Sequence, residues 1–600
     1  MKKLFLVLIA SLLVLTGCST GGGKASGTLT VANGAAMDGD FIDGFSNSSY
    51  DADGMNLIWG LSTYRYDNEL GALTPDMSVL DAEPTTETDA AGNKTYTMKI
   101  KKGLKFSDGK EVTAKDYVAG LLFQALPQWL EVAKIASAGY ELLGYEAYST
   151  GTAPEFTGVK LVDEQTFSIT IDAANLPYYY ETANATIAPI PTHVWFEAAK
   201  LNADGNGFDN TADEIAAAVK YVAETERFAP TVVTGPYLLE SFTNKIATFK
   251  VNPEYAGDHA GKKAKIETII VKEVSDELLI DAVASGEVDF APSIMTGTDI
   301  KKALDLGLKY HSYPRSGYGK IALMTDVAPT NDKYVRQGLA WVVDRSKFVE
   351  ALTAGYGKVV DGPYGLSMPQ YAAKAEDISS RIHQYTYNVE KANEVLDQSP
   401  YKFEADGTTP FDPTKASETG TYFRHNAEGA VLEIKHYATV EAKSVSDLIL
   451  SSVPPAAAAA GMKYTVTMGD WATFGAMLYD EIENDYNAFN YASSYPSFVY
   501  DPYTQFHSKF ATPGGSNTNQ VKDAELDSYI LAMRGSEPGD VEGYNTAFAD
   551  YIVKWNDLIP EIPLYSNQIH DIMTERVEGA DNITPIYNWA KAVLDLSVKN

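Results

Sequence analysis

Residues 94–120 of this 600-residue chain read KTYTMKIKKGLKFSDGKEVTAKDYVAG, and the stretch combines a strand, a turn and a helix. Tyr96 and Met98 alternate with polar residues, and this period of two predicts a strand with one buried face. A Ser-Asp-Gly triplet follows, which is typical of a turn. Thr113 and Asp116 then form a capping-box pattern that begins a helix. The stretch therefore predicts a local unit of mixed α/β structure.

Other stretches add strands and helices without a strict alternation between them. GTLTVAN (27–33) alternates like a strand, and two segments, an acidic surface helix at 197–226 and a polar loop at 401–430, look like additions. Further helices are predicted at 275–286 and 388–398, as a pair at 331–355 that meets at Asp344 and is capped by Gly355, and as a helix end at 456–460. This mixture predicts an α/β fold in several lobes.

The N-terminus has the pattern of an export signal. Lys2 and Lys3 precede the apolar run LFLVLIASLLVL (4–15), which is too short to span a bilayer comfortably as a mature helix. The single cysteine of the chain, Cys18, follows Leu-Thr-Gly and looks like the lipidated residue of a bacterial lipobox. We predict a lipoprotein signal peptide at 1–17, a flexible tether at 18–27 and an extracytoplasmic, lipid-anchored protein. A plain secretory signal with an incidental cysteine is the alternative.

Length and composition narrow the function classes. Residues 18–600 are enough for two to four domains. The net charge of −32 would repel a phosphate backbone, so nucleic acid is not expected as a partner. The 38 tyrosines have apolar rings and polar tips, which suit surfaces that accept varied ligands. We expect a monomeric protein that binds a ligand other than nucleic acid.

Signatures of catalysis are weak. The eight histidines are scattered, with no zinc-hydrolase motif, nucleophile elbow or phosphate-binding loop. The acidic segments DGDFIDG (38–44) and DADG (51–54) lack the spacing of a calcium loop and are predicted as Asx-type turns. A carboxylate pair suited to glycoside hydrolysis stays open, because sequence shows no distances. We therefore predict no catalytic residues, no metal site and no cofactor, with a lipoprotein hydrolase as the remote alternative.

Six segments in order resemble a known family. Besides residues 94–120, they are LSTYRYDNELGALTPDMSVL (61–80), TGPYLLESF (234–242) with FKVNPEYAG (249–257), AVASGEVDFA (282–291), VRQGLAWVVDRSKFVEAL (335–352) and NYASSYPSFVYDPYTQF (490–506). Together they resemble the family-5 extracellular solute-binding proteins, which include the oligopeptide- and dipeptide-binding lipoproteins of bacterial ABC importers.

This resemblance implies a two-lobed, periplasmic-binding-protein-like α/β fold of type II, in its large three-domain, cluster C form. Two crossovers near 310–318 and 562–567 would join the lobes. The implied domains are a discontinuous domain I at 28–62, 186–312 and 566–600, domain II at 63–185 and domain III at 313–565.

The implied function is capture of oligopeptides in the cleft between the lobes and delivery to ABC permease subunits with cytoplasmic ATPases. Backbone groups of the cleft would bond the peptide like a neighbouring strand, and the lobes would close around it. Two alternatives remain open: a non-peptide ligand on the same fold (a metal chelate, haem or an oligosaccharide), and a lipoprotein that senses peptides.

The resemblance also implies candidate binding residues. The loop after the first strand, the crossover tyrosines and the segment around 490–501 should line the cleft. The candidates are Asn33, Gly34, Ala35, Tyr310, Tyr313, Tyr491, Ala492, Ser493, Ser494, Tyr495, Asp501 and Tyr565. Where relatives commonly hold an aspartate that pairs with the peptide amine, this chain has Ser494 or a neighbour, and a serine cannot balance a buried ammonium.

Overall fold

The computed structural model describes residues 27–45, 48–68, 70–133, 138–479, 481–495 and 498–599. The predicted signal peptide, nearly all of the tether and Cys18 lie outside these ranges. Within the described part of the chain, every helix is too short or too polar to cross a bilayer.

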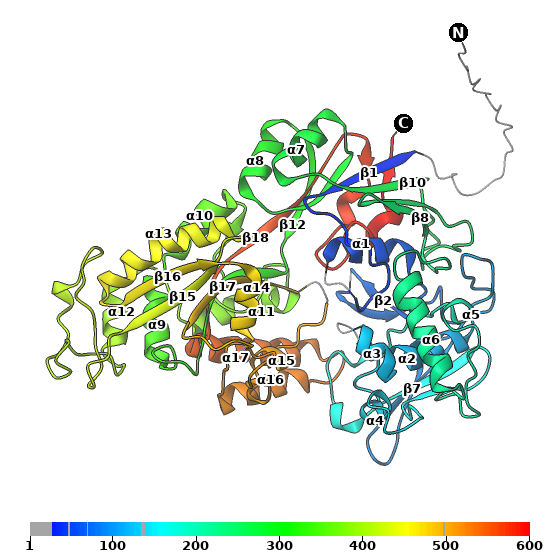
Figure 1. Cartoon of the computed structure of the whole chain (residues 1–600), viewed down its shortest axis with the longest axis horizontal. Coiled ribbons are helices and arrows are strands. Elements are labelled where there is room, and N and C mark those ends of the chain that lie inside the picture. Colours follow the sequence, from blue (N-terminus) through cyan, green and yellow to red (C-terminus); the bar gives the residue numbers. More distant parts are fainter. Residues whose placement is uncertain are drawn as a thin grey trace, which may run out of the picture.

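One long mixed sheet runs through the molecule (Figure 1). In its domain I part, β1 (Thr28–Asn33) pairs in parallel with β10 (Thr268–Glu273). The strands β10, β9 (Ile246–Val251) and β8 (Tyr237–Thr243) pair antiparallel. Across the sheet the strands are β16 (Lys463–Gly469), β15 (Glu433–Thr439), β17 (Ala488–Ser494), β13 (Gly317–Leu323), β18 (Glu561–Met573), β11 (Phe290–Ile294), β1 (Thr28–Asn33), β10 (Thr268–Glu273), β9 (Ile246–Val251) and β8 (Tyr237–Thr243).

The 13-residue strand β18 belongs to both lobes. Its first half pairs with β13, for example Ile562 with Ile321, and its second half pairs with β12 (Lys309–Pro314). The short strand β14 (Gly357–Lys358) pairs with its middle. Figure 1 shows β18 and β12 running from one half of the molecule to the other. These strands lie at the two predicted crossovers, and the predicted domain limits at 312/313 and 565/566 fall within them.

The opening stretch of sequence forms its predicted unit in domain II. There β5 (Lys94–Lys99) lies in a four-stranded antiparallel sheet with Tyr96 and Met98 buried. Helix α2 (Ala114–Gln124) begins after Thr113, whose backbone N–H donates to the Asp116 carboxylate at 2.9 Å. The other strands here are β4 (Thr85–Thr88), β6 (Val159–Leu161), β7 (Thr166–Ile171) and the hairpin β2 (Tyr64–Asp67) with β3 (Ala72–Pro75).

Buried apolar residues form several separate clusters, and we propose that they are the cores of the three expected domains. The domain II core contains residues from 42 to 232, and so continues past the predicted limit at 185 through Trp195, Val219 and Val222. The domain I core joins the N-terminal strand to residues 233–313 and to the C-terminal segment, where Trp589 is buried. The domain III cores lie within 318–564. Residues 187–232 thus pack on domain II, although we expected them in domain I.

Most predicted helices are present. The predicted helix at 197–226 is helical only from residue 212. The helix α10 (Arg345–Thr353) ends at Ala354, which adopts the left-handed conformation (φ 47°) one residue before the predicted cap, Gly355. The helices are α1 (Ser49–Ile58), α3 (Pro127–Val132), α4 (Tyr145–Ser149), α5 (Thr192–Trp195), α6 (Ala212–Tyr221), α7 (Asp276–Ser285), α8 (Gly297–Asp305), α9 (Lys333–Val342), α10 (Arg345–Thr353), α11 (Pro369–Arg381), α12 (Val389–Leu396), α13 (Lys443–Ala459), α14 (Trp471–Leu478), α15 (Tyr503–Phe506), α16 (Ala524–Arg534) and α17 (Val541–Leu558).

One predicted turn is wrong. The acidic segment 51–54 lies inside α1, because Ser48 caps the helix by accepting from the Asp51 N–H at 3.4 Å. The Asp51 carboxylate accepts from the Gly39 N–H at 3.1 Å and so ties the preceding loop to the helix. The helix directs its second acidic residue, Asp53, toward the C-terminal segment of domain I, where it accepts from Trp589.

Candidate functional site: a cavity between the lobes

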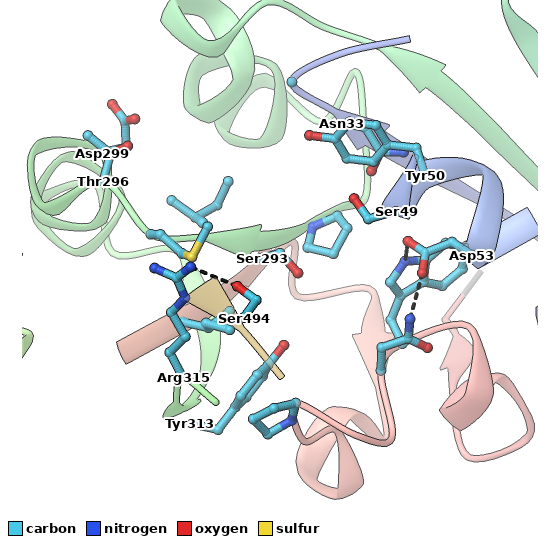
Figure 2. A pocket seen from close by; sticks show the side chains of 18 of the residues that line it. Asn33, Ser49, Tyr50, Asp53, Ser293, Thr296, Asp299, Tyr313, Arg315 and Ser494 are labelled. Carbon is cyan, nitrogen blue, oxygen red and sulfur yellow. Dashed lines mark hydrogen bonds between the residues drawn. The ribbon is translucent and has the colours of Figure 1, made fainter. Parts of the chain in front are cut away.

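A cavity of about 430 Å³ lies beside the crossover strands, within the size range of small-ligand sites. Domain I supplies most of its wall, and the bend between β12 and β13 and the end of β17 supply the rest (Figure 2). The polar lining residues are Asn33, Ser49, Tyr50, Asp53, Asp276, Ser293, Thr296, Asp299, Tyr313, Arg315, Ser316, Ser494, Tyr495, Thr584 and Asn588.

The end of β1 presents an unused amide to this cavity. Asn33 is 3% exposed, and neither its side-chain nitrogen nor its oxygen has a hydrogen-bond partner among the described residues. A buried amide without partners is costly, so a ligand that bonds to it gains from the pairing. The next residue is Gly34, and a Cβ there would lie 2.0 Å from an Asp276 carboxylate oxygen, so a larger residue would push the Asp276 side chain aside. The sequence thus leaves this strand end open for a ligand.

Two buried aspartates lie on the domain I side. Asp53 accepts from Trp589 Nε1 at 2.7 Å and Asn588 Nδ2 at 2.6 Å, and burial raises its pKa to about 7. Behind the cavity wall, Asp571 accepts from the Ser293 N–H at 2.8 Å, and burial raises its pKa to about 6. Both carboxyl groups therefore titrate far above their ordinary range.

The raised pKa of Asp53 predicts that stability depends on pH. Between its ordinary pKa of 3.8 and about 7, the folded chain keeps a proton that the unfolded chain releases. The folded state binds more protons in this window, so the free energy of unfolding falls as the pH rises and levels off above it. Relative to Asp53→Asn, the wild-type melting temperature should fall by a few degrees between about pH 5 and 7. Parallel pH profiles for the two proteins would contradict the raised pKa.

The opposite side of the cavity carries a guanidinium. Arg315 Nη2 donates to Ser494 Oγ at 2.7 Å, and longer contacts reach the Ser493 carbonyl at 3.4 Å and Asn567 Oδ1 at 3.5 Å. Figure 2 shows Arg315 and Ser494 together, across the cavity from Asn33, Tyr50 and Asp53. Burial lowers the pKa of Arg315, as expected for a charge held away from water.

Beside this guanidinium, β17 has an open edge. All seven of its residues pair with β13, but only Ala488 and Phe489 pair with β15 on the other side. Beyond Phe489, the outer edge of β17 has no strand partner among the described residues. Such an edge can accept an extended peptide as an added strand.

The candidate residues divide into two groups. Those that line the cavity are Asn33, Gly34, Tyr313, Ser494 and Tyr495. Those that do not line it are Ala35, Tyr310, Tyr491, Ala492, Ser493, Asp501 and Tyr565. Sequence reasoning missed Asp53, Asp276, Arg315 and Trp589 as lining residues. Asp53 lay in a predicted turn, Asp276 in a predicted helix and Arg315 in a predicted crossover, but none of these patterns indicated a binding role.

Asp501 is engaged elsewhere. It forms an ion pair with Arg534 and accepts from the Tyr503 N–H at 3.0 Å. Tyr491 lies under the Lys320 ammonium, 4.3 Å from its ring centre, and Tyr310 is 47% exposed. An amine anchor at Asp501 would have to share the carboxylate with Arg534.

Domains II and III also touch at a distance from the crossovers, through contacts that we call the latch. Arg534 Nη2 lies 2.6 Å from Glu141 of domain II. The Tyr179 and Tyr544 rings stack with centroids 4.0 Å apart, and the Tyr180 hydroxyl donates to that of Tyr544 at 3.0 Å. The lobes are therefore joined by strands at the hinge and held together by the latch.

Two lobes joined by crossover strands, with a cavity beside those strands, are the arrangement of the two-lobed solute-binding proteins. The chain belongs to the bacterial extracellular solute-binding proteins, family 5, whose model matches residues 82–517. These are substrate-binding proteins of transporters rather than enzymes, and they include oligopeptide-binding members. In the described residues, no group of three or more His, Cys, Asp or Glu side chains is placed to hold a metal ion.

The proteins similar to this chain include oligopeptide-binding proteins. The chain is 26% identical to the oligopeptide-binding protein OppA of Bacillus subtilis over 274 residues, which is 45% of each protein. It is 22% identical to the oligopeptide-binding protein AppA of the same organism over 96% of each. The structure of that AppA with a nonapeptide covers 96% of this chain and 99% of its own (TM-score 0.66, 19% identity). The periplasmic EDTA-binding protein EppA covers 97% and 98% (TM-score 0.70, 15% identity).

Proposed function

We propose that this protein captures peptides in the interlobe cavity and delivers them to the permease of an ABC transporter. The observation that carries the proposal is the unused Asn33 amide at the cavity, together with the open edge of β17, whose last residue, Ser494, lines the cavity. An extended peptide offers an amide at every residue, so it can satisfy both without regard to its side chains. The oligopeptide-binding relatives support the same ligand class.

Closure supports retention of the ligand. The crossover strands β12, β13 and β18 allow the lobes to hinge, and the latch stabilises the closed arrangement. A peptide that contacts both walls binds the closed form better than the open form and shifts the population toward it. The permease would then bind the closed, peptide-bound form of the protein.

Mass spectrometry of ligands released by denaturing the purified protein tests the proposal directly. We expect peptides. Release of a metal chelate, haem or an oligosaccharide, and no peptide, would contradict it, and the likeness to the EDTA-binding fold makes a chelate the second candidate. A peptide-sensing role would use the same cavity, and loss of peptide uptake in a strain lacking the gene separates transport from sensing.

The absence of a fixed carboxylate at Ser494 predicts tolerance of a blocked peptide amine. The Ser494 hydroxyl accepts a hydrogen bond from Arg315, so position 494 offers no carboxylate to pair with the ammonium group of a peptide. N-acetylation of a bound peptide should weaken binding less than about tenfold, or about 1.4 kcal/mol, because main-chain bonds along the peptide remain. Calorimetry on one peptide, free and acetylated, measures this. A loss of about a hundredfold would indicate that another acid at the cavity, Asp53 or Asp276, holds the amine.

Membrane attachment is proposed to depend on Cys18 alone. The motivation is the lipobox-like sequence before it and the absence of another cysteine in the chain. Cys18→Ala should leave the signal uncleaved at this site and free of acyl chains, as judged by intact-protein mass spectrometry of membrane extracts. A variant still cleaved before residue 18 and retained by acyl chains would rule the proposal out.

A further inference from the structure

A second cavity, of about 600 Å³, lies against helix α1 beside the first one. Tyr50 and Asp53 of this helix line the first cavity, and Met55 and Asn56 line the second. The helix turns these pairs toward neighbouring faces, because only residues three or four apart share a face. The other residues that line the second cavity lie within 42–43, 59–62, 120–124, 138–140 and 183–195. Helix α1 therefore forms a wall of both cavities, and domain II supplies most of the rest of the second.

Two tryptophans give the second cavity a rigid apolar wall. The rings of Trp59 and Trp195 meet edge to face with centroids 6.0 Å apart, and Trp195 stacks on Trp129 at 6.1 Å. Trp59 Nε1 donates to the Phe41 carbonyl at 2.7 Å, which fixes this ring. Trp195 is 3% exposed, and its indole N–H has no acceptor among the described residues. Buried N–H groups nearly always have an acceptor, so this one indicates a wall that a ligand completes.

The lining of the second cavity is almost free of charge. Of the described residues that line it, Asp43 alone is charged, whereas four charged side chains line the first cavity. Its apolar lining includes Met55, Leu121, Ile187 and Ile190. An acidic side chain would find no cation here, and burying an unpaired charge is costly. The chemistry of this cavity therefore favours an uncharged, apolar group.

The shared helix sets the distance between the two cavities. At about 1.5 Å per residue, Tyr50 and Asn56 lie about 9 Å apart along the axis of α1. An extended peptide advances about 3.3 Å per residue, so about three residues of it cover this distance. One peptide can thus reach from the first cavity into the second.

We propose that the second cavity is a distal subsite that binds an uncharged, apolar side chain of the cargo, about three residues from the part held in the first cavity. This inference rests on the proposed peptide-binding function. It adds a length requirement and a side-chain preference that main-chain bonds do not supply. Peptides of two or three residues are too short to fill both cavities, whereas longer ones gain the burial of one apolar side chain.

A leucine scan of a hexapeptide tests the subsite. The probes are a hexapeptide of alanine and serine and its six single-leucine versions, compared by calorimetry. Wild-type protein should bind at least one leucine version about tenfold more tightly than the parent peptide, because the leucine side chain leaves water. Glutamate at the same position should give no gain.

The variants assign the gain to the second cavity. Ala52→Phe fills this cavity from an exposed position on α1 and should abolish the gain from leucine. Ala373→Phe makes the same change at an exposed position on α11 of domain III and should leave the gain intact. If Ala52→Phe misfolds, Ala188→Phe fills the cavity from another exposed position.

Crosslinking locates the side chain directly. A photoreactive leucine at the favoured position of the hexapeptide should label residues within 52–59 or 183–195, as mapped by mass spectrometry of the digested protein. The same residue in a tripeptide should not label them. Equal affinity for all seven hexapeptides, a gain that survives in Ala52→Phe, or labels confined to the first cavity would overturn the subsite and leave peptide binding intact. Failure to bind any peptide would overturn the peptide-binding function, and the subsite with it.

Discussion

Replacing Glu561 by alanine is expected to lower the free energy of unfolding by about 3–5 kcal/mol. Glu561 begins β18, and its carboxylate lies 2.7 Å from the Lys320 ammonium on β13 and accepts from the Tyr318 hydroxyl. The two charged side chains are 1% and 5% exposed. Burial opposes the charge of Lys320, yet the surrounding groups, led by the Glu561 carboxylate, together outweigh burial and raise the pKa of the lysine. Without Glu561, the ammonium keeps its contacts with the Tyr318 and Tyr491 rings but loses its carboxylate partner.

A matched exposed pair controls for the substitution itself. Lys301 and Asp305 have the same 2.7 Å separation but are about two-thirds exposed, so Asp305→Ala should cost less than about 1 kcal/mol. Replacing both partners, Lys320→Met with Glu561→Leu, should recover most of the lost stability, because no charge remains buried. Denaturant unfolding of the four proteins measures these differences. Equal losses for the exposed and buried variants would contradict the role given to burial.

Arg534→Ala is expected to weaken peptide binding by about thirtyfold or more. The arginine joins Asp501 to Glu141 across the lobes, and its guanidinium lies 4.2 Å from the Tyr178 ring centre. Removing one partner of an interfacial charge pair costs about 2–5 kcal/mol, and the loss of the contacts with Glu141 and Tyr178 falls on the closed form alone. Because binding is coupled to closure, the lower bound of about 2 kcal/mol corresponds to that thirtyfold loss.

Small-angle scattering and calorimetry together check this expectation. The wild-type radius of gyration should fall when peptide binds, and Arg534→Ala should remain larger at the same peptide concentration. Arg381→Ala, which removes an exposed ion pair within domain III, should bind like the wild-type protein. Unchanged affinity in Arg534→Ala, or a wild-type radius that does not respond to saturating peptide, would contradict closure through the latch.

The fold could be predicted because its evidence is local. Alternation in 94–100, the cap at Thr113 and the ordered family-like segments each depend on residues near one another in sequence. The C-terminal limit of domain II was harder to predict from the sequence. The apolar residues near Trp195 and Val219 have no pattern that assigns them to the core of domain I or of domain II, and the structure places them in the core of domain II. Only the packing of α6 decides between domains I and II.

The candidate site was accessible only in part. Asn33 and Ser494 could be found because each ends a strand at a position that the family resemblance marks. Asp53 and Trp589 are 536 residues apart and meet only through the domain I core, so no spacing rule connects them. Arg315 sits at a bend between two strands, where sequence does not show its contact with Ser494.

The shared strand β18 also sets the order in which the chain can be completed during synthesis. β1 ends at Asn33, but β18 begins only at Glu561, and β11 pairs with both of them. At about 5–20 residues per second, roughly half a minute to two minutes separates the two strands. Domains II and III have continuous chains for their cores and can bury them meanwhile. Domain I must keep an unpaired strand edge until the last part of the chain emerges, so it is the domain most exposed to misassembly.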